Sequence, residues 1–405
     1  MKSAPRGPRT CDAERRGILP PPRAIFGGLL PLKLRPDCLP CVLHQALQFA
    51  RAQSEDDFSV RKLLGVVLRS LQETDWGHSP ADLLQLVLRD ASEALKGGDP
   101  FAALRAKGAL LFAQLAAELR PTLAEAEDPL GVALLHATAA NLADELVFPR
   151  FRNLDVAKEL ASAVEEGFAR GSVDEFRRAL EPAERVLYLL DNAGEAHFDA
   201  LLVEQLIQAG KTVTVVTRGE GLLHDATAAD AEVAGFTRPP PPEPEPAAAA
   251  EGSEPDPAPE APEAPEADAS APEPAEAAPS DDAAPPAESS EPASEPSSSE
   301  TEPEEPTGPT RLPIAGVLSQ RAGELGWPTP SRKSDLGQAL EEADLVIAKG
   351  SAYYETMDDV EDRAVIHLLR AKCPPVADAL GVQSGDLVLL HRPPSLGTES
   401  EVSGE

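Results

Sequence analysis

The stretch RVLYLLDNAGEAHFDALLVEQLIQAGKTVTVVTRG, residues 185–219, decides the fold of this chain. A short apolar run ends in the turn Asn192–Gly194, a helical pattern follows, and a β-branched run occupies 211–219. Strand, helix and strand in this order form a βαβ unit, whose strands pair in parallel through a right-handed crossover. The sequence therefore predicts an α/β domain with a Rossmann-like parallel sheet.

Two later segments repeat this pattern. DLVIAKG at 344–350 and DLVLLHR at 386–392 are apolar runs of strand type, and helical patterns precede both. We therefore expect one discontinuous α/β domain, made of residues 181–238 and 311–393.

The chain upstream of this domain has a helical pattern. Segments such as SVRKLLGVVLRSLQ and PADLLQLVLRDASEAL repeat Leu and Val at i, i+3 and i+4, and Ser79-Pro80 and Asp99-Pro100 have the form of helix starts. Residues 31–180 are accordingly predicted to form an N-terminal all-helical domain.

Low-complexity sequence interrupts and flanks these parts. Residues 239–310 hold 21 of the 42 prolines and consist almost entirely of Pro, Glu, Ala, Ser and Asp. Such a segment buries too little apolar surface to offset its ordering entropy, so we expect a disordered acidic insertion. Residues 1–30 are interpreted as a flexible N-terminal extension and 394–405 as a flexible tail.

Charge and hydropathy exclude several classes of partner. The formal net charge is -33, and 20 of the acidic residues lie in 239–310, which has no Lys or Arg. An acidic chain opposes non-specific binding to nucleic acids and anionic membranes. No stretch reaches the roughly 18 apolar residues of a membrane span, and no apolar segment follows the basic N-terminus as in a signal peptide. We expect a cytoplasmic protein that binds neither nucleic acid nor membrane.

Polar residues follow three of the predicted strands. Asp191 and Asn192 come directly after the first, Arg218 and then Asp225 after the second, and Lys349 at the end of the third. Loops at the carboxyl ends of parallel strands converge on one edge of the sheet, where ligands bind. These five side chains are therefore candidates for a common site.

This set of side chains suits a divalent cation and a phosphate group. Two carboxylates and an amide oxygen are hard ligands for Mg²⁺ or Mn²⁺. Gly194 permits a tight turn into a helix whose N-terminal amides favour an anion, and Lys349 adds a positive charge. The alternative is structural, since Asp and Asn at strand ends often cap the next helix or close a turn.

The motif DNAGE at 191–195 closely resembles the signature of the damage-control phosphatase family, also called the acidic-residue methyltransferase-like metal-binding family. The resemblance continues through TRGEGLLHDATAADA (217–231), DLVIAKGSAYYETM (344–357), AKCPPVADALGVQSGDLVLL (371–390), LKLRPDCLPCVLHQAL (32–47) and the NLAD stretch at 141–144. It covers nearly the whole chain outside the N-terminal extension and the insertion. The chain is most similar to the CxxC-containing, stand-alone prokaryotic type.

The resemblance implies a divalent-metal-dependent phosphatase that acts on small phosphorylated metabolites, for example sugar phosphates, with Mn, Mg, Co or Ni as the ion. By position, it makes Asp191, Asn192 and Asp225 the metal ligands and Lys349 the lysine on the phosphate side. The residues expected on the substrate side are Asn141, Asp144, Gly194, Glu195, Arg218, Gly350 and Glu355. The site would lie between the helical and α/β domains.

Some positions depart from the family pattern. The family has a KGxGN stretch where this chain has Lys349 to Tyr353, so that a tyrosine stands at the asparagine position, and Ala140 stands where glycine is common. The tyrosine bears on substrate recognition and leaves the metal ligands intact.

Cys38 and Cys41 form a CxxC pair at the predicted start of a helix. Without a second pair this is a weak zinc signal, and it lacks the βαβ context of a redox motif. The pair is either a second metal site or structural, and Cys373 becomes a third partner if the ends of the chain meet.

Other activities are open at this point. The family's second name suggests a carboxyl methyltransferase that uses S-adenosylmethionine, although no GxGxG turn follows the first strand. A non-enzymatic, metal-stabilised binding module is the third hypothesis. For a phosphatase, the nucleophile is either Asp191 or a metal-bound water.

Overall fold

The computed structural model describes residues 32–94, 101–142, 155–219, 223–237 and 311–395. The expected extension at 1–30, the insertion at 239–310 and the tail from residue 396 lie outside the described residues. The same holds for the predicted helix start at Asp99-Pro100.

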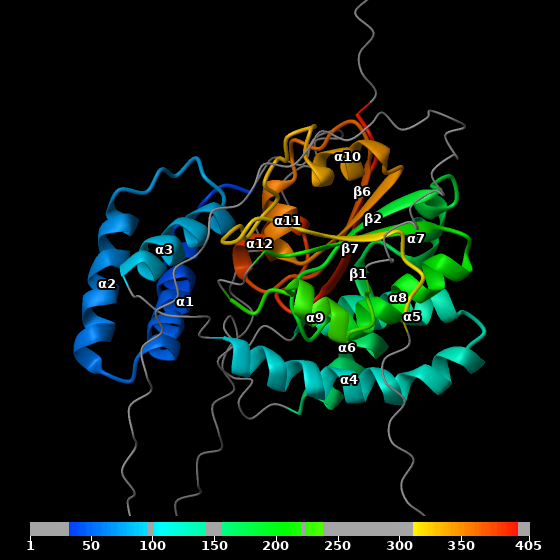
Figure 1. Ribbon diagram of the computed structural model, residues 1–405, viewed down its shortest axis with the longest axis horizontal. Coiled ribbons are helices and arrows are strands. Elements are labelled where there is room, and N and C mark those ends of the chain that lie inside the picture. Colours follow the sequence, from blue (N-terminus) through cyan, green and yellow to red (C-terminus); the bar gives the residue numbers. More distant parts are fainter. Residues whose placement is uncertain (1–31, 95–100, 143–154, 220–222, 238–310, 396–405) are drawn as a thin grey trace, which may run out of the picture. The chain divides into compact units, whose positions relative to one another are not determined.

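A seven-stranded sheet forms the centre of the fold (Figure 1). Its strands, given in the order in which they lie side by side, are β1 (Phe168–Arg170), β7 (Leu387–Arg392), β6 (Ala364–Arg370), β5 (Leu345–Lys349), β2 (Arg185–Leu189), β3 (Thr212–Thr217) and β4 (Gly316–Ser319). All neighbouring strands are parallel except β6 and β7, which are antiparallel. The predicted α/β class with a mostly parallel sheet is confirmed.

The described part of the chain contains twelve α-helices. They are α1 (Cys38–Gln53), α2 (Asp57–Gln72), α3 (Pro80–Ala94), α4 (Ala102–Glu125), α5 (Pro129–Ala139), α6 (Val156–Glu166), α7 (Val173–Leu180), α8 (Ala196–Gln208), α9 (Ala228–Val233), α10 (Asp335–Glu342), α11 (Ser351–Thr356) and α12 (Pro374–Leu380). A 3-10 turn, η1, follows α5 at Ala140–Leu142. Helix α3 begins at Pro80, as the Ser79-Pro80 pair predicts.

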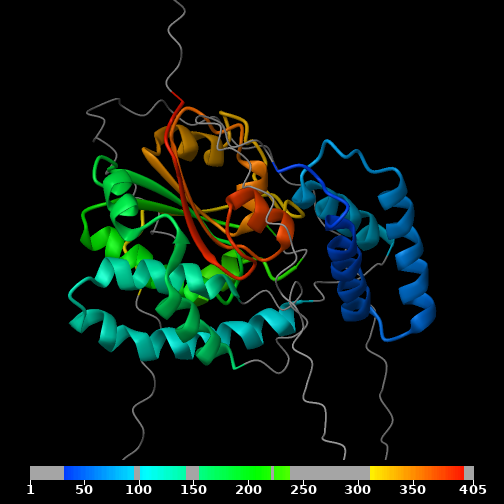
Figure 2. The same cartoon turned by 180° about the vertical axis from the view of Figure 1, so that it is seen from behind.

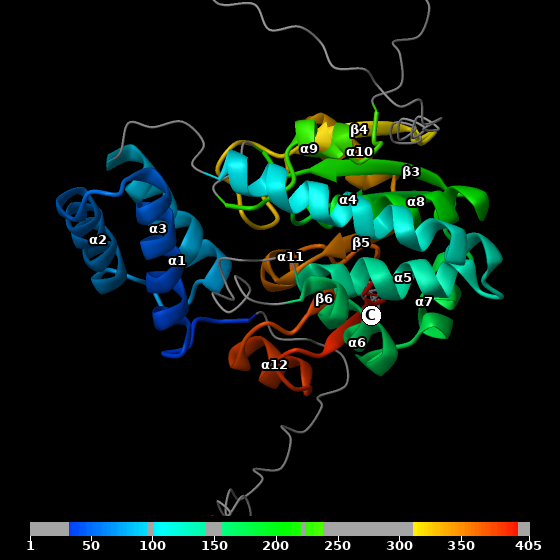
Figure 3. The same ribbon diagram turned by 90° about the horizontal axis from the view of Figure 1, so that it is seen from below.

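Both faces of the sheet are buried, and alternate residues of each central strand face opposite sides. In β2, Val186 and Tyr188 pack into the core shared with α5 and α8, whereas Leu187 and Leu189 pack into the core that contains Leu336 of α10. Figure 3 shows α4, α5 and α8 lying across the strands, and Figure 2 shows α4, in cyan, below the strands. Two-sided burial explains why these strands are continuous apolar runs.

The segment at 31–180 is divided between two cores. Helices α1, α2 and α3 pack on one another around Phe49, Leu63 and Val87. Helices α4 to α7 contribute instead to the core of the sheet, and residues 168–170 form strand β1, which the helical pattern did not predict. The three helices α1–α3 are therefore a small bundle in their own right.

The chain leaves and re-enters the sheet region at neighbouring points around the insertion. The Leu312 amide donates a hydrogen bond of 3.2 Å to the Gly235 carbonyl oxygen. Residues on either side of 239–310 are thus joined by the fold itself. None of the described helices is long and apolar enough to cross a membrane.

Candidate active site

The predicted metal ligands come from two loops that are held together by backbone hydrogen bonds. Asp191 and Asn192 follow β2 directly, and Asp225 lies in the loop between β3 and α9. Asn192 and Asp225 form an isolated antiparallel bridge, in which the Ala193 amide donates to the His224 carbonyl oxygen at 2.9 Å. The Ala226 amide donates to the Asp191 carbonyl oxygen at 2.8 Å. This bridge brings the three residues to one place.

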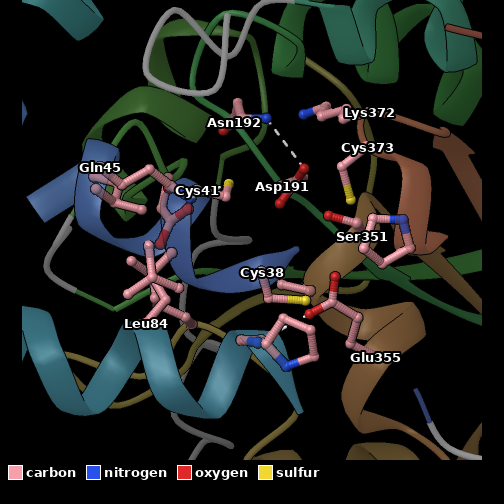
Figure 4. Close-up of a pocket in the computed structure, with 18 of the residues that line it drawn as sticks. Cys38, Cys41, Gln45, Leu84, Asp191, Asn192, Ser351, Glu355, Lys372 and Cys373 are labelled. Atoms are coloured by element: carbon pink, nitrogen blue, oxygen red, sulfur yellow. Dashed lines mark hydrogen bonds between the residues drawn. The ribbon is translucent and has the colours of Figure 1, made fainter. Parts of the chain in front are cut away.

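Asp191, Asn192 and Asp225 line one pocket, with an empty volume of about 930 Å³ that is partly open to solvent. Figure 4 shows it between the loop after β2, helix α1 and the segments that follow β5 and β6. Its other polar side chains include Ser351, Glu355 and Lys372. The pocket therefore combines residues from both ends of the chain.

The Asp191 carboxylate is held from three directions. Arg218 Nη2 donates to Oδ1 at 2.9 Å, while the Nδ2 atoms of Asn141 and Asn192 donate to Oδ2 at 2.9 and 3.1 Å. Arg218 is almost fully buried, and its guanidinium lies 3.9 Å from the centre of the Tyr353 ring. Arg218 thus braces Asp191 from behind the pocket, and the tyrosine that departs from the family pattern packs on this arginine.

Gly350 lies against the Asp191 carboxylate and leaves room for it because glycine has no side chain. Gly350 has a φ of 84°, and a Cβ atom there would overlap Asp191 Oδ2. Gly194 is also closely packed, since a Cβ would lie 3.3 Å from the Phe112 ring, which would have to move by a few tenths of an ångström. Both predicted glycines therefore act through close packing, and Gly350 does so against the site itself.

Lys349 lies beneath the pocket, and its side chain has no exposed surface. Its Nζ donates to Glu195 Oε2 at 3.0 Å, Asp199 Oδ1 at 2.7 Å and the Ala137 carbonyl oxygen at 2.8 Å. Burial by itself lowers the pKa of Lys349, but Asp199 and Glu195 outweigh this effect, so the pKa is raised and the ammonium stays charged. The structure does not bring Lys349 to the wall of the pocket.

Glu195 connects Lys349 to the pocket residues. Its Oε1 accepts hydrogen bonds from Nδ2 of Asn141, at 2.7 Å, and from Nδ2 of Asn192. Burial raises the pKa of Glu195 and Lys349 opposes that shift. On the far side of Lys349, the Tyr188 hydroxyl donates to Asp199 at 2.7 Å. Buried charges of this kind fix the orientation of the side chains that they bind.

Lys372 is the pocket lysine that sequence reasoning missed. It follows β6, lines the pocket, and is 9% exposed. Figure 4 shows its side chain near Asn192 and Asp191. The run AVIHLLR at 364–370 has the apolar character of a strand, and recognising it would have identified Lys372 as another residue at a strand end.

The three cysteines Cys38, Cys41 and Cys373 line the same pocket, and none of them is in a disulfide bond with another described residue. The ends of the chain therefore do meet here, as the hypothesis of a third partner required. Burial raises the pKa of Cys38, and raises that of Cys373 to about 12, so these two thiols are protonated at neutral pH. Among the described residues, no group of three or more His, Cys, Asp and Glu side chains has the arrangement of a metal site.

Of the other predicted residues, Asn141 is in place and Asp144 lies outside the described part of the chain. Asn141 is fully buried in η1, and its Oδ1 accepts a hydrogen bond of 3.2 Å from the Arg370 amide. Asn141 therefore joins the loop after β2 to the end of β6.

The donor atoms of the pocket fit a hard divalent ion. Both hydrogens of the Asn192 amide group point to Asp191 and Glu195, which leaves Oδ1 as the atom that can bind a cation. With the carboxylates of Asp191 and Asp225 the set is made of oxygen atoms only, as Mg²⁺ and Mn²⁺ prefer. Three protein ligands leave coordination positions for water and a substrate.

Comparisons with known proteins identify the family of this chain. The sequence profile of the damage-control phosphatase ARMT1-like domain matches residues 34–241 and 315–388. A damage-control phosphatase of Archaeoglobus fulgidus is 24% identical over 366 residues, which cover 88% of this chain and 98% of that protein. An uncharacterised protein of Methanocaldococcus jannaschii is also 24% identical, over 89% of this chain and 96% of its own length.

A solved structure has the same fold. The crystal structure of a DUF89 family protein from Pyrococcus horikoshii superposes with a TM-score of 0.62 at 21% sequence identity. The match covers 88% of this chain and 98% of that one. The profile match spans most of the chain, and this chain therefore belongs to the damage-control phosphatase ARMT1-like family.

Proposed function

We propose that this chain is a divalent-metal-dependent phosphatase of small phosphorylated metabolites, and that Asp191, Asn192 and Asp225 hold the ion. One observation carries the proposal: these three oxygen-bearing side chains line a single pocket together with Lys372. Membership of a family of damage-control phosphatases supports the reaction class. Mn, Mg, Co and Ni are the candidate ions.

Each group has a task in this proposal. The ion, when bound, polarises a phosphoryl oxygen and offsets its charge. Lys372 pairs with the remaining phosphoryl oxygens, because it is the lysine that reaches the pocket. Lys349 holds Glu195, and Glu195 in turn orients the amide groups of Asn141 and Asn192.

We infer that water is the nucleophile and that Asp191 acts only as a ligand. Arg218 pairs with one oxygen of Asp191, and two amide groups donate to the other. These contacts fix the carboxylate in place and reduce its nucleophilicity, which disfavours direct attack on phosphorus.

The remaining wall of the pocket would contact the part of the substrate that bears no phosphate. Val42 of α1, Leu84 of α3, Leu223 and Leu325 give this wall an aliphatic surface. Figure 4 shows Leu84 on the side of α1 and α3, away from Lys372. A phosphorylated metabolite with an apolar portion would bury it there.

The test is phosphate release from p-nitrophenyl phosphate by purified protein, with each of the four ions and with a chelator. Activity should require an ion and should be lost in Asp191→Ala and Asp225→Ala. Asp362→Ala, an exposed acid outside the pocket, is the matched control. Activity that survives in both ligand variants would refute the assignment. Transfer of a methyl group from S-adenosylmethionine to a carboxyl group, without phosphate release, would favour the methyltransferase hypothesis.

A further inference from the structure

Glu355 is a buried carboxyl group that faces the pocket. It lies on α11, the short helix after β5, and its side chain is 8% exposed. Glu355, Asp191 and Asp225 line the same pocket. Figure 4 shows the Glu355 carboxyl group directed into this pocket, beside Cys38 and below Asp191 and Ser351. It is therefore within the space that a substrate would occupy.

The two oxygens of Glu355 have different surroundings. Oε2 accepts a hydrogen bond of 2.9 Å from the Ala81 amide, at the first turn of α3. An oxygen that accepts an N–H bond is the carbonyl-type oxygen of a carboxylic acid, so the acid hydrogen of Glu355 belongs on Oε1. One oxygen is thus anchored and the other is left to donate.

The surroundings of Glu355 favour the acid form. The charged residues of the described chain that act on the pKa of Glu355, Asp82 and Asp191, are both acidic. Burial, followed by repulsion from these two residues, raises the pKa of Glu355 to about 8, although the Ala81 amide lowers it. At neutral pH Glu355 therefore carries a proton that it can give away.

We propose that Glu355 is the general acid that protonates the leaving-group oxygen of the substrate. This inference rests on the proposed phosphatase function. A water oxygen forms a bond to phosphorus and releases a proton to solvent, while the bond from phosphorus to the leaving oxygen breaks. The electron pair of that bond stays on the leaving oxygen, which takes the proton of Glu355 and departs as an alcohol. Glu355 then regains a proton from solvent, and inorganic phosphate is the second product.

The experiment compares two substrates that differ in how much they need an acid. An alkyl phosphate releases a strongly basic alkoxide and needs a proton, whereas p-nitrophenyl phosphate releases a stable phenolate and does not. With Glu355→Gln, kcat/KM for n-butyl phosphate should fall about 100-fold or more, and for p-nitrophenyl phosphate by no more than about threefold. Glutamine keeps the hydrogen bond to the Ala81 amide and cannot donate a proton.

Gln85→Leu is the matched control, because it removes another hydrogen bond of α3 and shows what movement of this helix does to the two rates. Gln85 Oε1 accepts a hydrogen bond of 2.9 Å from the Leu325 amide, the other contact of this kind between α3 and the sheet-side loops. Loosening α3 in this way should change the rates of both substrates by the same factor. The selective loss in Glu355→Gln then cannot come from movement of α3.

Three results would overturn the assignment of Glu355: equal losses with both substrates, no loss with either, or a selective loss in Gln85→Leu. The activity of the wild-type protein on both substrates is measured first. If it hydrolyses neither, the proposed phosphatase function itself is refuted. If Glu355→Gln does not fold, the hydrolysis rates of a series of substituted phenyl phosphates by the wild-type protein test the role of Glu355 instead. A weak dependence of rate on leaving-group basicity supports the general acid, and a steep one refutes it.

Discussion

The backbone of Gly350 lies directly against the carboxylate of Asp191, at a φ of 84° that side chains rarely tolerate. Gly350→Ala should therefore strain the backbone by about 1–3 kcal/mol, because a positive φ with a ψ of 171° is essentially restricted to glycine, and should push Asp191 out of place. A displacement of about 1 Å at a reacting centre can cost 100-fold in rate. We expect phosphatase activity to fall by about that factor while circular dichroism still reports a folded protein. Gly167→Ala is the control, because Gly167 has a similar backbone conformation, with a φ of 73° and a ψ of -161°, and open space around it, so this change should leave the activity unchanged.

Substitution of Lys349 should reduce the stability of the protein, whereas substitution of Lys372 should weaken its binding of phosphate. Lys349→Met leaves Glu195 and Asp199 buried without their cation, and the free energy of unfolding should fall by about 3–5 kcal/mol. Lys372→Met should raise the inhibition constant of inorganic phosphate about 10- to 100-fold, because it removes a positive charge from the pocket wall. Urea denaturation and inhibition assays measure the two effects. Weaker phosphate binding in a stable Lys349→Met variant would restore the role that the family resemblance implies for Lys349.

The stability of the protein should depend on pH through Glu355. The pKa of Glu355 is raised from 4.5 to about 8, so its contribution to folding is fully present below about pH 4.5 and is lost as the pH rises through about 8. The Glu355→Gln variant has no ionisable group at this position, so it does not lose this contribution to stability as the pH rises. The variant should therefore become more stable relative to wild type as the pH rises across this window, by a few kcal/mol in all. Thermal denaturation between pH 5 and pH 9 measures the difference, and exposed Glu342→Gln should show none.

Deleting 240–309 should leave folding and turnover nearly unchanged. The segment has the composition of an unanchored chain, and the hydrogen bond between Leu312 and Gly235 already joins the residues beside it. Loop closure depends only weakly on length, so a short Gly-Ser linker should raise the free energy of unfolding by no more than about 2 kcal/mol. A large fall in melting temperature would contradict this prediction.

The aliphatic wall should determine which phosphorylated metabolites react well. Leu84→Ser places a hydroxyl group among Val42, Leu223 and Leu325. For alkyl phosphates, kcat/KM should rise with chain length in the wild type, by up to about fourfold per buried methylene, and this gain should shrink in the variant. A panel of alkyl and sugar phosphates measures the trend, and a flat response in the wild type would exclude a role for this wall.

The strands that the sequence predicted are those with two buried faces. Strands β2, β3, β5 and β7 are apolar runs bounded by turns, and all four are present. Strands β1 and β4 have three and four residues at the edges of the sheet, too few to produce a pattern. Strand β6 has a readable pattern that was overlooked, and its antiparallel pairing with β7 depends on tertiary packing.

The candidate site was predictable only in part, for similar reasons. Asp191 and Asn192 follow their strand directly, so their position is a local property of the sequence. Asp225 comes well after β3, and only the bridge to Asn192 brings it to the pocket. The Ala137 carbonyl oxygen of α5 accepts a hydrogen bond from Lys349 and helps to hold this lysine beneath the pocket. This contact is one reason why Lys372, and not Lys349, lines the pocket. No spacing rule within the chain encodes that contact.

The backbone bridge between Asn192 and Asp225 means that the fold would set the positions of the proposed metal ligands in advance. An incoming cation would find this bridge already formed, so its binding energy would go largely into holding the substrate. The protein treated with a chelator should accordingly keep its amide protection from hydrogen exchange at Ala193 and Ala226, and lose only its chemistry.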